Sequence, residues 1–152
     1  MSVLLTLQRR VRGWSPTRRD LAQWASAALG RSGHGREIGV CTVGKTESAR
    51  LNARFRGREK ATNVLSFPPA PLPRAPRAGP PPLGELVICP RVLEAEARAQ
   101  DKSRRAHWAH LVVHGALHLA GYDHVRAADA RRMERREIAV LRRLGFANPY
   151  RS

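Results

Sequence analysis

Three histidines in the C-terminal half of the chain have a spacing that suits metal binding. His114 and His118 are four residues apart, so on a helix their side chains lie one turn apart on the same face. Gly121 is placed to end that helix in a left-handed conformation, and His124 follows three residues later, where the chain can turn back to the same ion. We therefore predict that His114, His118 and His124 bind one divalent metal ion at the end of a long helix.

The number and type of these ligands indicate the chemistry. Neutral imidazoles suit zinc and other late first-row transition metals, and three protein ligands leave the fourth tetrahedral position open for water. A zinc-bound water ionises near pH ~7, which is the basis of metal-assisted hydrolysis. The sequence thus predicts a hydrolase that carries one Zn²⁺ per chain.

Each of these histidines, taken alone, would be explained more simply as a hydrogen-bonding residue on a partly buried helix face. Three histidines at spacings of four and six, with a glycine between the second and the third, favour the metal site over that explanation. His110 lies one further turn back. It is expected to be a packed residue or a hydrogen-bond partner of the site, because a fourth histidine ligand would leave no open position.

Two other functions are compatible with such a cluster. The metzincin peptidases have the same ligand spacing, but there a glutamate follows the first histidine and acts as the general base. This chain has Gly115 at that position, which cannot accept a proton, so peptidase activity is not expected. A binding protein in which zinc only stabilises the fold is the second alternative, and the open coordination position disfavours it.

The composition indicates one basic domain. The 152 residues include 28 Lys and Arg against 12 Asp and Glu, which gives a formal net charge of +16. Such a surface attracts polyanions, and nucleic acid is the most common polyanionic partner of so basic a protein. A bias of the source genome towards arginine codons is an alternative explanation, in which many of these arginines are simply solvated.

The cysteines and the apolar stretches bear on the cellular location. Cys41 and Cys89 are too few and too far apart for a disulfide framework, and both are expected to be reduced core residues. The N-terminal residues do not resemble a signal peptide. Residues 106–122 lack Asp, Glu, Lys and Arg, but they carry four histidines and are slightly too short for a membrane span. We expect a cytoplasmic protein without a membrane partner.

Hydrophobic periodicity predicts four strands and five helices. The expected strands span residues 3–7, 37–43, 63–67 and 85–89, and the expected helices span residues 16–29, 46–55, 90–100, 104–120 and 126–144. Ser15 is the expected N-cap of the first helix. The order of these elements indicates an α+β fold in which a small four-stranded mixed sheet packs with about five helices.

A proline-rich segment interrupts this pattern. Residues 68–82 contain eight of the eleven prolines, which remove amide donors and fix φ. We predict an extended surface loop, inserted within a single domain that spans residues 1–152.

Three further motifs carry a resemblance to a known family. They are Arg56-Gly57, the sequence ATNVLSFP at residues 61–68 and the sequence LGELVI at residues 83–88. Together with residues 114–124 they resemble the YbeY family of bacterial endoribonucleases, over most of the chain. The resemblance implies a metal-dependent, single-strand endoribonuclease that matures the 3′ end of small-subunit ribosomal RNA and takes part in ribosome quality control. It also implies ribosomal RNA as the substrate, and we expect no small-molecule substrate. A basic single domain with one cleft has little room for reading bases, so we expect small-subunit ribosomal proteins or a ribosome-assembly GTPase to supply the specificity.

By the same resemblance, His114, His118 and His124 match the family's metal ligands, and Arg56 matches an arginine of its catalytic cleft. From the residues alone, Arg56 would be one solvated side chain in a basic run. The expected catalytic residues are Arg56 and His114. Either a zinc-bound hydroxide or a ribose 2′-hydroxyl attacks the phosphodiester, while Arg56 stabilises the charge on the phosphoryl oxygens.

Three further residues lie in or near these motifs. Asp123 is expected either to hydrogen-bond a ligand histidine or to cap the turn before it. Ala61 and Glu85 stand where many family members have proline and aspartate, and neither belongs to the metal motif.

Overall fold

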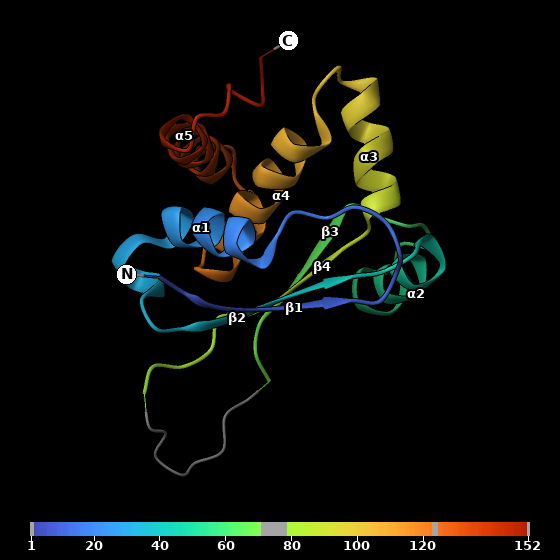
Figure 1. Cartoon of the computed structure of the whole chain (residues 1–152), viewed down its shortest axis with the longest axis horizontal. Coiled ribbons are helices and arrows are strands. Elements are labelled where there is room, and N and C mark those ends of the chain that lie inside the picture. Colours follow the sequence, from blue (N-terminus) through green and yellow to red (C-terminus); the bar gives the residue numbers. More distant parts are fainter. Residues whose placement is uncertain (1, 71–78, 123–124, 152) are drawn as a thin grey trace.

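Four strands form one mixed sheet in the computed structural model, which describes residues 2–70, 79–122 and 125–151. The strands are β1 (Leu4–Arg9), β2 (Glu37–Thr42), β3 (Val64–Phe67) and β4 (Gly84–Ile88). Their order across the sheet is β1-β2-β4-β3, with β1, β2 and β4 parallel and β3 antiparallel to β4 (Figure 1). The predicted four-stranded mixed sheet is therefore confirmed.

Five α-helices accompany the sheet, as predicted. They are α1 (Arg18–Leu29), α2 (Lys45–Arg56), α3 (Pro90–Ala99), α4 (Arg104–Leu119) and α5 (Ala127–Arg143). The predicted start of α1 was wrong by two residues. Thr17 caps this helix by accepting a hydrogen bond from the amide of Asp20, whereas Ser15 accepts one from the side chain of Arg9.

Alternation along the strands divides the apolar side chains between the two faces of the sheet. One face contributes to the main core, together with α1, α3, α4 and α5, through Leu5, Ile38, Val40, Val64, Leu86 and Ile88. The other face forms a smaller cluster with Leu51 of α2, through Cys41, Leu65, Val87 and Phe67. Helices therefore cover both faces, and α2 alone contributes to the smaller cluster. Cys41 and Cys89 are buried and not disulfide-bonded, in agreement with the prediction.

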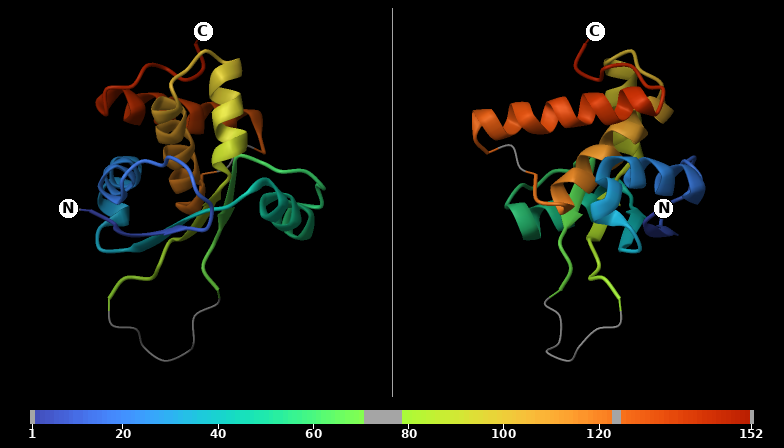
Figure 2. Two further views of the ribbon diagram at one scale, coloured as in Figure 1. Left: turned by 45° about the vertical axis from the view of Figure 1, so that its right-hand side comes forward. Right: turned by 90° about the vertical axis from the view of Figure 1, so that its left-hand side faces the viewer.

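Helix α4 is the central helix of the fold. It packs against α1, α3, α5, β3 and β4, and α5 lies across its outer side (Figure 2). Its buried side chains include Trp108, Val112, Val113, Ala116 and Leu117. Gly115 is also buried, and a Cβ atom at this position would lie 2.7 Å from Cδ2 of Leu86. A glycine at position 115 therefore allows α4 to approach the sheet closely.

The end of α4 has the geometry that the sequence predicted. Gly121 has a φ of 103°, in the left-handed region, and its amide donates to the carbonyl of His118. The amide of Tyr122 donates to the carbonyl of Leu117, which completes a Schellman motif. The helix thus ends at Leu119, one residue after His118, and the chain turns at Gly121.

The proline-rich segment is described only at its two ends. Residues 68–70 and 79–83 belong to no helix or strand, and the middle of the predicted loop lies outside the described residues. Within the described parts of the chain, no helix combines the length and the apolar character needed to cross a membrane.

Candidate active-site cleft

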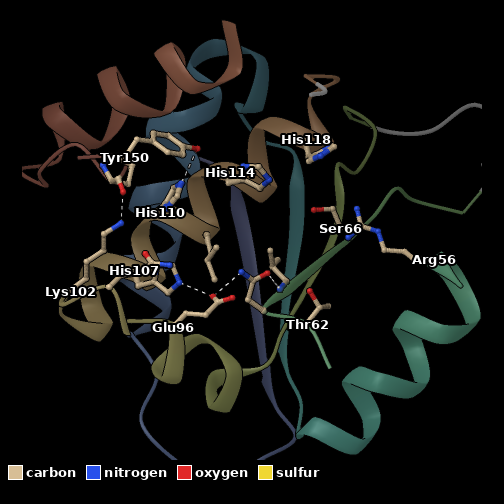
Figure 3. Close-up of a pocket in the computed structure, with 15 residues that line it drawn as sticks. Arg56, Thr62, Ser66, Glu96, Lys102, His107, His110, His114, His118 and Tyr150 are labelled. Carbon is tan, nitrogen blue, oxygen red and sulfur yellow. Dashed lines mark hydrogen bonds and ion pairs between the residues drawn. The ribbon is translucent and has the colours of Figure 1, made fainter. Parts of the chain in front are cut away.

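A polar cleft of about 440 Å³ opens beside α4 (Figure 3). It lies between the exposed ends of α2 and α3, the edge strand β3 and the C-terminal segment. The lining residues that bear on the chemistry are Arg56, Glu96, His107, His110, His114, His118 and Tyr150. Arg56, His114 and His118, which the sequence singled out, therefore line the same cleft.

His114 and His118 project from one face of α4, as their spacing required. Their ring centroids are 5.4 Å apart and the ring planes are inclined at 75°. Both side chains are only partly buried, because this end of α4 borders the cleft. His124 and Asp123, the other residues predicted for this site, lie outside the described residues.

The carboxylate of Glu137, on α5, fixes the orientation of His114. Its Oε1 atom lies 2.6 Å from Nδ1 of His114, and the side chain is fully buried. Burial by itself would raise the pKa of Glu137, but hydrogen bonds from His110, His114 and Tyr150 outweigh burial and lower that pKa to about 2. An ionised carboxylate only accepts hydrogen bonds, so Nδ1 of His114 is the donor. In a tautomer with a single ring proton, the lone pair is then on Nε2.

These residues fit the predicted metal. Two imidazoles that each bind a tetrahedral zinc ion at about 2.0–2.1 Å place their ring centroids about 5 Å apart, which agrees with the 5.4 Å between His114 and His118. A carboxylate that holds the second nitrogen of a histidine is the usual support of a zinc ligand. Among residues 2–70, 79–122 and 125–151, no three His, Cys, Asp or Glu side chains are grouped to hold an ion, and the third predicted ligand falls outside these ranges.

His110 and Tyr150 complete the surroundings of Glu137. The hydroxyl of Tyr150 donates to Oε2 of Glu137 at 2.5 Å, and Nε2 of His110 lies 3.3 Å from that hydroxyl and 3.5 Å from Oε1 of Glu137. Burial, followed by the hydrogen bond to Glu137, raises the pKa of Tyr150, so its hydroxyl keeps its proton. His110 is therefore a packed neighbour of the predicted metal ligands, as expected.

Arg56 is the last residue of α2, and local hydrogen bonds hold this helix beside β3. Ser48 exchanges hydrogen bonds with the backbone of Thr62, and the side chain of Asn52 donates to the carbonyl of Lys60. Arg56 itself is exposed and extends towards Ser66, on the side of the cleft that carries His118 (Figure 3). A cation is thus positioned near the histidines by a separate and well-anchored element.

A second polar cluster lies at the other end of the cleft. Oε1 of Glu96 is 2.9 Å from the side-chain amide of Asn63 and 2.9 Å from Nε2 of His107. Burial lowers the pKa of His107, although its hydrogen bond to Glu96 acts in the opposite direction. His107 therefore favours the neutral form. Its hydrogen bond to Glu96 could not be predicted from its position in the sequence.

Two further residues of the site, Glu137 and Tyr150, were not predicted from the sequence. The burial of Glu137 could have been predicted, because this residue falls on the same face of α5 as Met133, Val140 and Leu141, which are also buried. A carboxylate at a core position needs a buried partner, and the histidines of α4 were the candidates. Tyr150 lies in an irregular segment whose spacing carries no comparable signal.

Comparisons with known proteins agree on the family. The sequence model of the family described as Endoribonuclease YbeY matches residues 12–145. A protein named Endoribonuclease YbeY from Methylococcus capsulatus is 50% identical over 150 residues, which cover 97% of this chain and 95% of the relative. A protein of the same name from Nitrosococcus oceani is 43% identical over 153 residues, which cover 100% of this chain and 99% of the relative.

A solved structure supports the fold. The solution structure of TM1509 from Thermotoga maritima superposes with a TM-score of 0.60 and covers 98% of this chain and 100% of that protein. Its sequence identity is 22%, so this likeness concerns the fold alone. The family match and the two close relatives together establish that the chain belongs to the YbeY family.

Proposed function

We propose that this protein is a zinc-dependent, single-strand endoribonuclease that matures the 3′ end of small-subunit ribosomal RNA in the cytoplasm and takes part in ribosome quality control. Two relatives that match nearly the whole chain are named endoribonucleases. The observation that carries the proposal is the cleft in which Arg56 of α2 faces the same space as His114 and His118 of α4. This combination suits a phosphodiester, which needs both an activated nucleophile and a cation for its negative charge.

His114, His118 and His124 would hold the zinc ion. When bound, zinc supplies the Lewis acidity that activates a nucleophile and polarises the phosphodiester. Glu137 keeps the proton of His114 on Nδ1, which would leave the lone pair of Nε2 available to a metal ion. Arg56 binds a non-bridging phosphoryl oxygen and stabilises the negative charge that increases in the transition state.

Basic side chains in and around the cleft can contact the phosphates of the RNA backbone. Arg131, Arg135 and Arg142 are exposed on α5, and Lys102 lines the cleft. Such contacts neutralise phosphates without reading bases, so we propose that small-subunit ribosomal proteins or a ribosome-assembly GTPase supply the specificity.

The experiment compares cleavage of a fragment from the 3′ end of small-subunit precursor RNA by wild type and by two histidine variants. Metal-free protein should cut slowly, and added zinc should restore cleavage. His114→Ala should stay inactive with zinc, whereas His34→Ala, which changes an exposed histidine of the loop before β2, should match wild type. If RNA binding persists and all samples cleave equally, or none cleaves, the protein is an RNA-binding factor and not an endoribonuclease.

A further inference from the structure

The C-terminal segment reaches the predicted metal site through the side chain of Tyr150. Phe146 and Gly145 follow α5 in a second Schellman motif, in which their amides donate to the carbonyls of Leu141 and Arg142. The chain then passes over the cleft wall, where the ammonium group of Lys102 donates to the carbonyl of Pro149. Tyr150 is thereby placed with its hydroxyl 2.5 Å from Oε2 of Glu137.

The ring and the hydroxyl of Tyr150 have different surroundings. The residue is 47% exposed, so the ring adds little to the hydrophobic core, although one edge contacts the ring of His110 at a centroid distance of 5.3 Å. The hydroxyl nevertheless reaches a carboxylate that is fully buried. The main contribution of this side chain is therefore its hydrogen bond, and not packing.

The two oxygens of Glu137 have different partners. Oε1 accepts from His114, and Oε2 accepts from Tyr150. Without Tyr150, Oε2 would lose this buried donor, and the carboxylate could rotate or admit water to satisfy that oxygen. Either change would loosen the constraint on the ring of His114, because a single carboxylate plane connects the two hydrogen bonds.

We propose that Tyr150 is a positioning residue, which holds Glu137 and through it the ring of His114 for metal binding. The C-terminal segment then contributes to the geometry of the predicted metal site. This inference rests on the proposed function only where zinc is concerned, since the orientation of His114 can be observed in the metal-free protein.

The first test measures zinc affinity, by competition with a chromophoric chelator, for wild type, Tyr150→Phe, Glu137→Gln and the double variant. Substitution of a residue that supports a zinc ligand typically costs about 10- to 100-fold in affinity, and Tyr150 acts one step further out, so we expect a loss of roughly three- to tenfold for Tyr150→Phe. In the Glu137→Gln background the same substitution should have almost no further effect. Unchanged affinity in Tyr150→Phe, or an equal loss in both backgrounds, would overturn the inference.

The second test follows the Nδ1 proton of His114 by ¹⁵N-resolved NMR of the metal-free protein. Wild type should give a resolved, slowly exchanging signal, and Tyr150→Phe should broaden or lose it without lowering the melting temperature by more than a few degrees. Tyr122→Phe, which removes the hydroxyl of the only other tyrosine in the sequence, should leave the signal unchanged. An identical signal in Tyr150→Phe contradicts the positioning role even if zinc does not bind, whereas failure of wild type to bind zinc contradicts only the proposed metal function.

Discussion

Nδ1 of His114 donates a hydrogen bond of 2.6 Å to Glu137, whose carboxylate is fully buried between α4 and α5. A buried charge is costly unless it is paired and hydrogen-bonded, and this carboxylate meets that requirement through the side chains that border the cleft. The interaction joins the last helix of the fold to the helix that carries the predicted metal ligands. Packing of α5 against α4 is therefore coupled to the geometry of the site.

Glu137→Gln should weaken zinc binding while keeping the size of the side chain. Loss of the negative charge weakens the hydrogen bond that orients His114 and allows its ring to turn, and such changes typically lower metal affinity by about 10- to 100-fold. The measurement is a zinc competition titration of the purified variant. Glu134→Gln, an exposed carboxylate on the same helix, is the matched control and should bind zinc as wild type does. Equal affinity in the two variants would show that Glu137 does not support the metal site.

Arg56→Ala should slow RNA cleavage without changing zinc affinity. The guanidinium is expected to act on the phosphoryl oxygens and not on the ion, and loss of one such stabilising group typically costs about 10²-fold or more in rate. Single-turnover cleavage at saturating zinc measures this effect. Arg54→Ala removes a neighbouring cation that rests on the ring of Phe55, outside the cleft, and should retain most of the activity. Similar rates for the two variants would remove Arg56 from the mechanism.

Gly115→Glu should destabilise the fold and should not create a peptidase. The position that carries the general base in metzincins faces Leu86 here, and even a Cβ atom would approach that side chain to 2.7 Å. Overpacking costs about 1–3 kcal/mol, and an unpaired buried charge adds more, so we expect a loss of at least about 3 kcal/mol in the free energy of unfolding. Chemical denaturation measures the loss. Gly44→Glu, at a position with nothing within 4 Å of its Cβ site, should change stability far less.

His107 should make the stability of the metal-free protein depend on pH. Burial lowers the pKa of His107 in the folded state, so as the pH falls below about 6.5 the unfolded chain takes up a proton before the folded chain does. The contribution of neutral His107 to the free energy of unfolding is fully present above that pH. It is lost as the pH falls towards the lowered pKa of the folded state. Denaturant unfolding in a chelating buffer, from about pH 7.5 to about pH 5.5, should show a smaller loss for His107→Gln than for wild type. Equal pH dependence in the two proteins would contradict this assignment.

Much of this architecture could be predicted from local patterns. Each of three features depends on only a few neighbouring residues, and the structure agrees with the prediction in each case. They are the alternation along the strands, the common face of His114 and His118, and the end of α4 at a glycine. The N-terminus of α1 was misplaced because Ser15 and Thr17 are both good caps. In the structure Thr17 caps the helix by accepting from the amide of Asp20, whereas Ser15 accepts from the side chain of Arg9.

The support of the site could not be predicted in the same way. Glu137 meets His114 across 23 positions of sequence, and Tyr150 meets Glu137 across a further 13, so both contacts depend on how α5 and the following segment dock. The placement of Arg56 in the cleft likewise depends on the anchoring of α2 to Thr62 and Lys60. Local spacing identifies residues that can do chemistry, whereas tertiary packing decides which residues hold them.

The most direct measurement is the rate of RNA cleavage by metal-free wild-type protein as zinc is added in known ratios. We expect a rate near background without zinc, a linear rise as zinc is added, and a plateau at one zinc ion per chain, with no rise for His118→Ala. A metal-free protein that cleaves RNA at the full rate, or a rate that does not respond to zinc or any other divalent transition metal, would contradict the central claim.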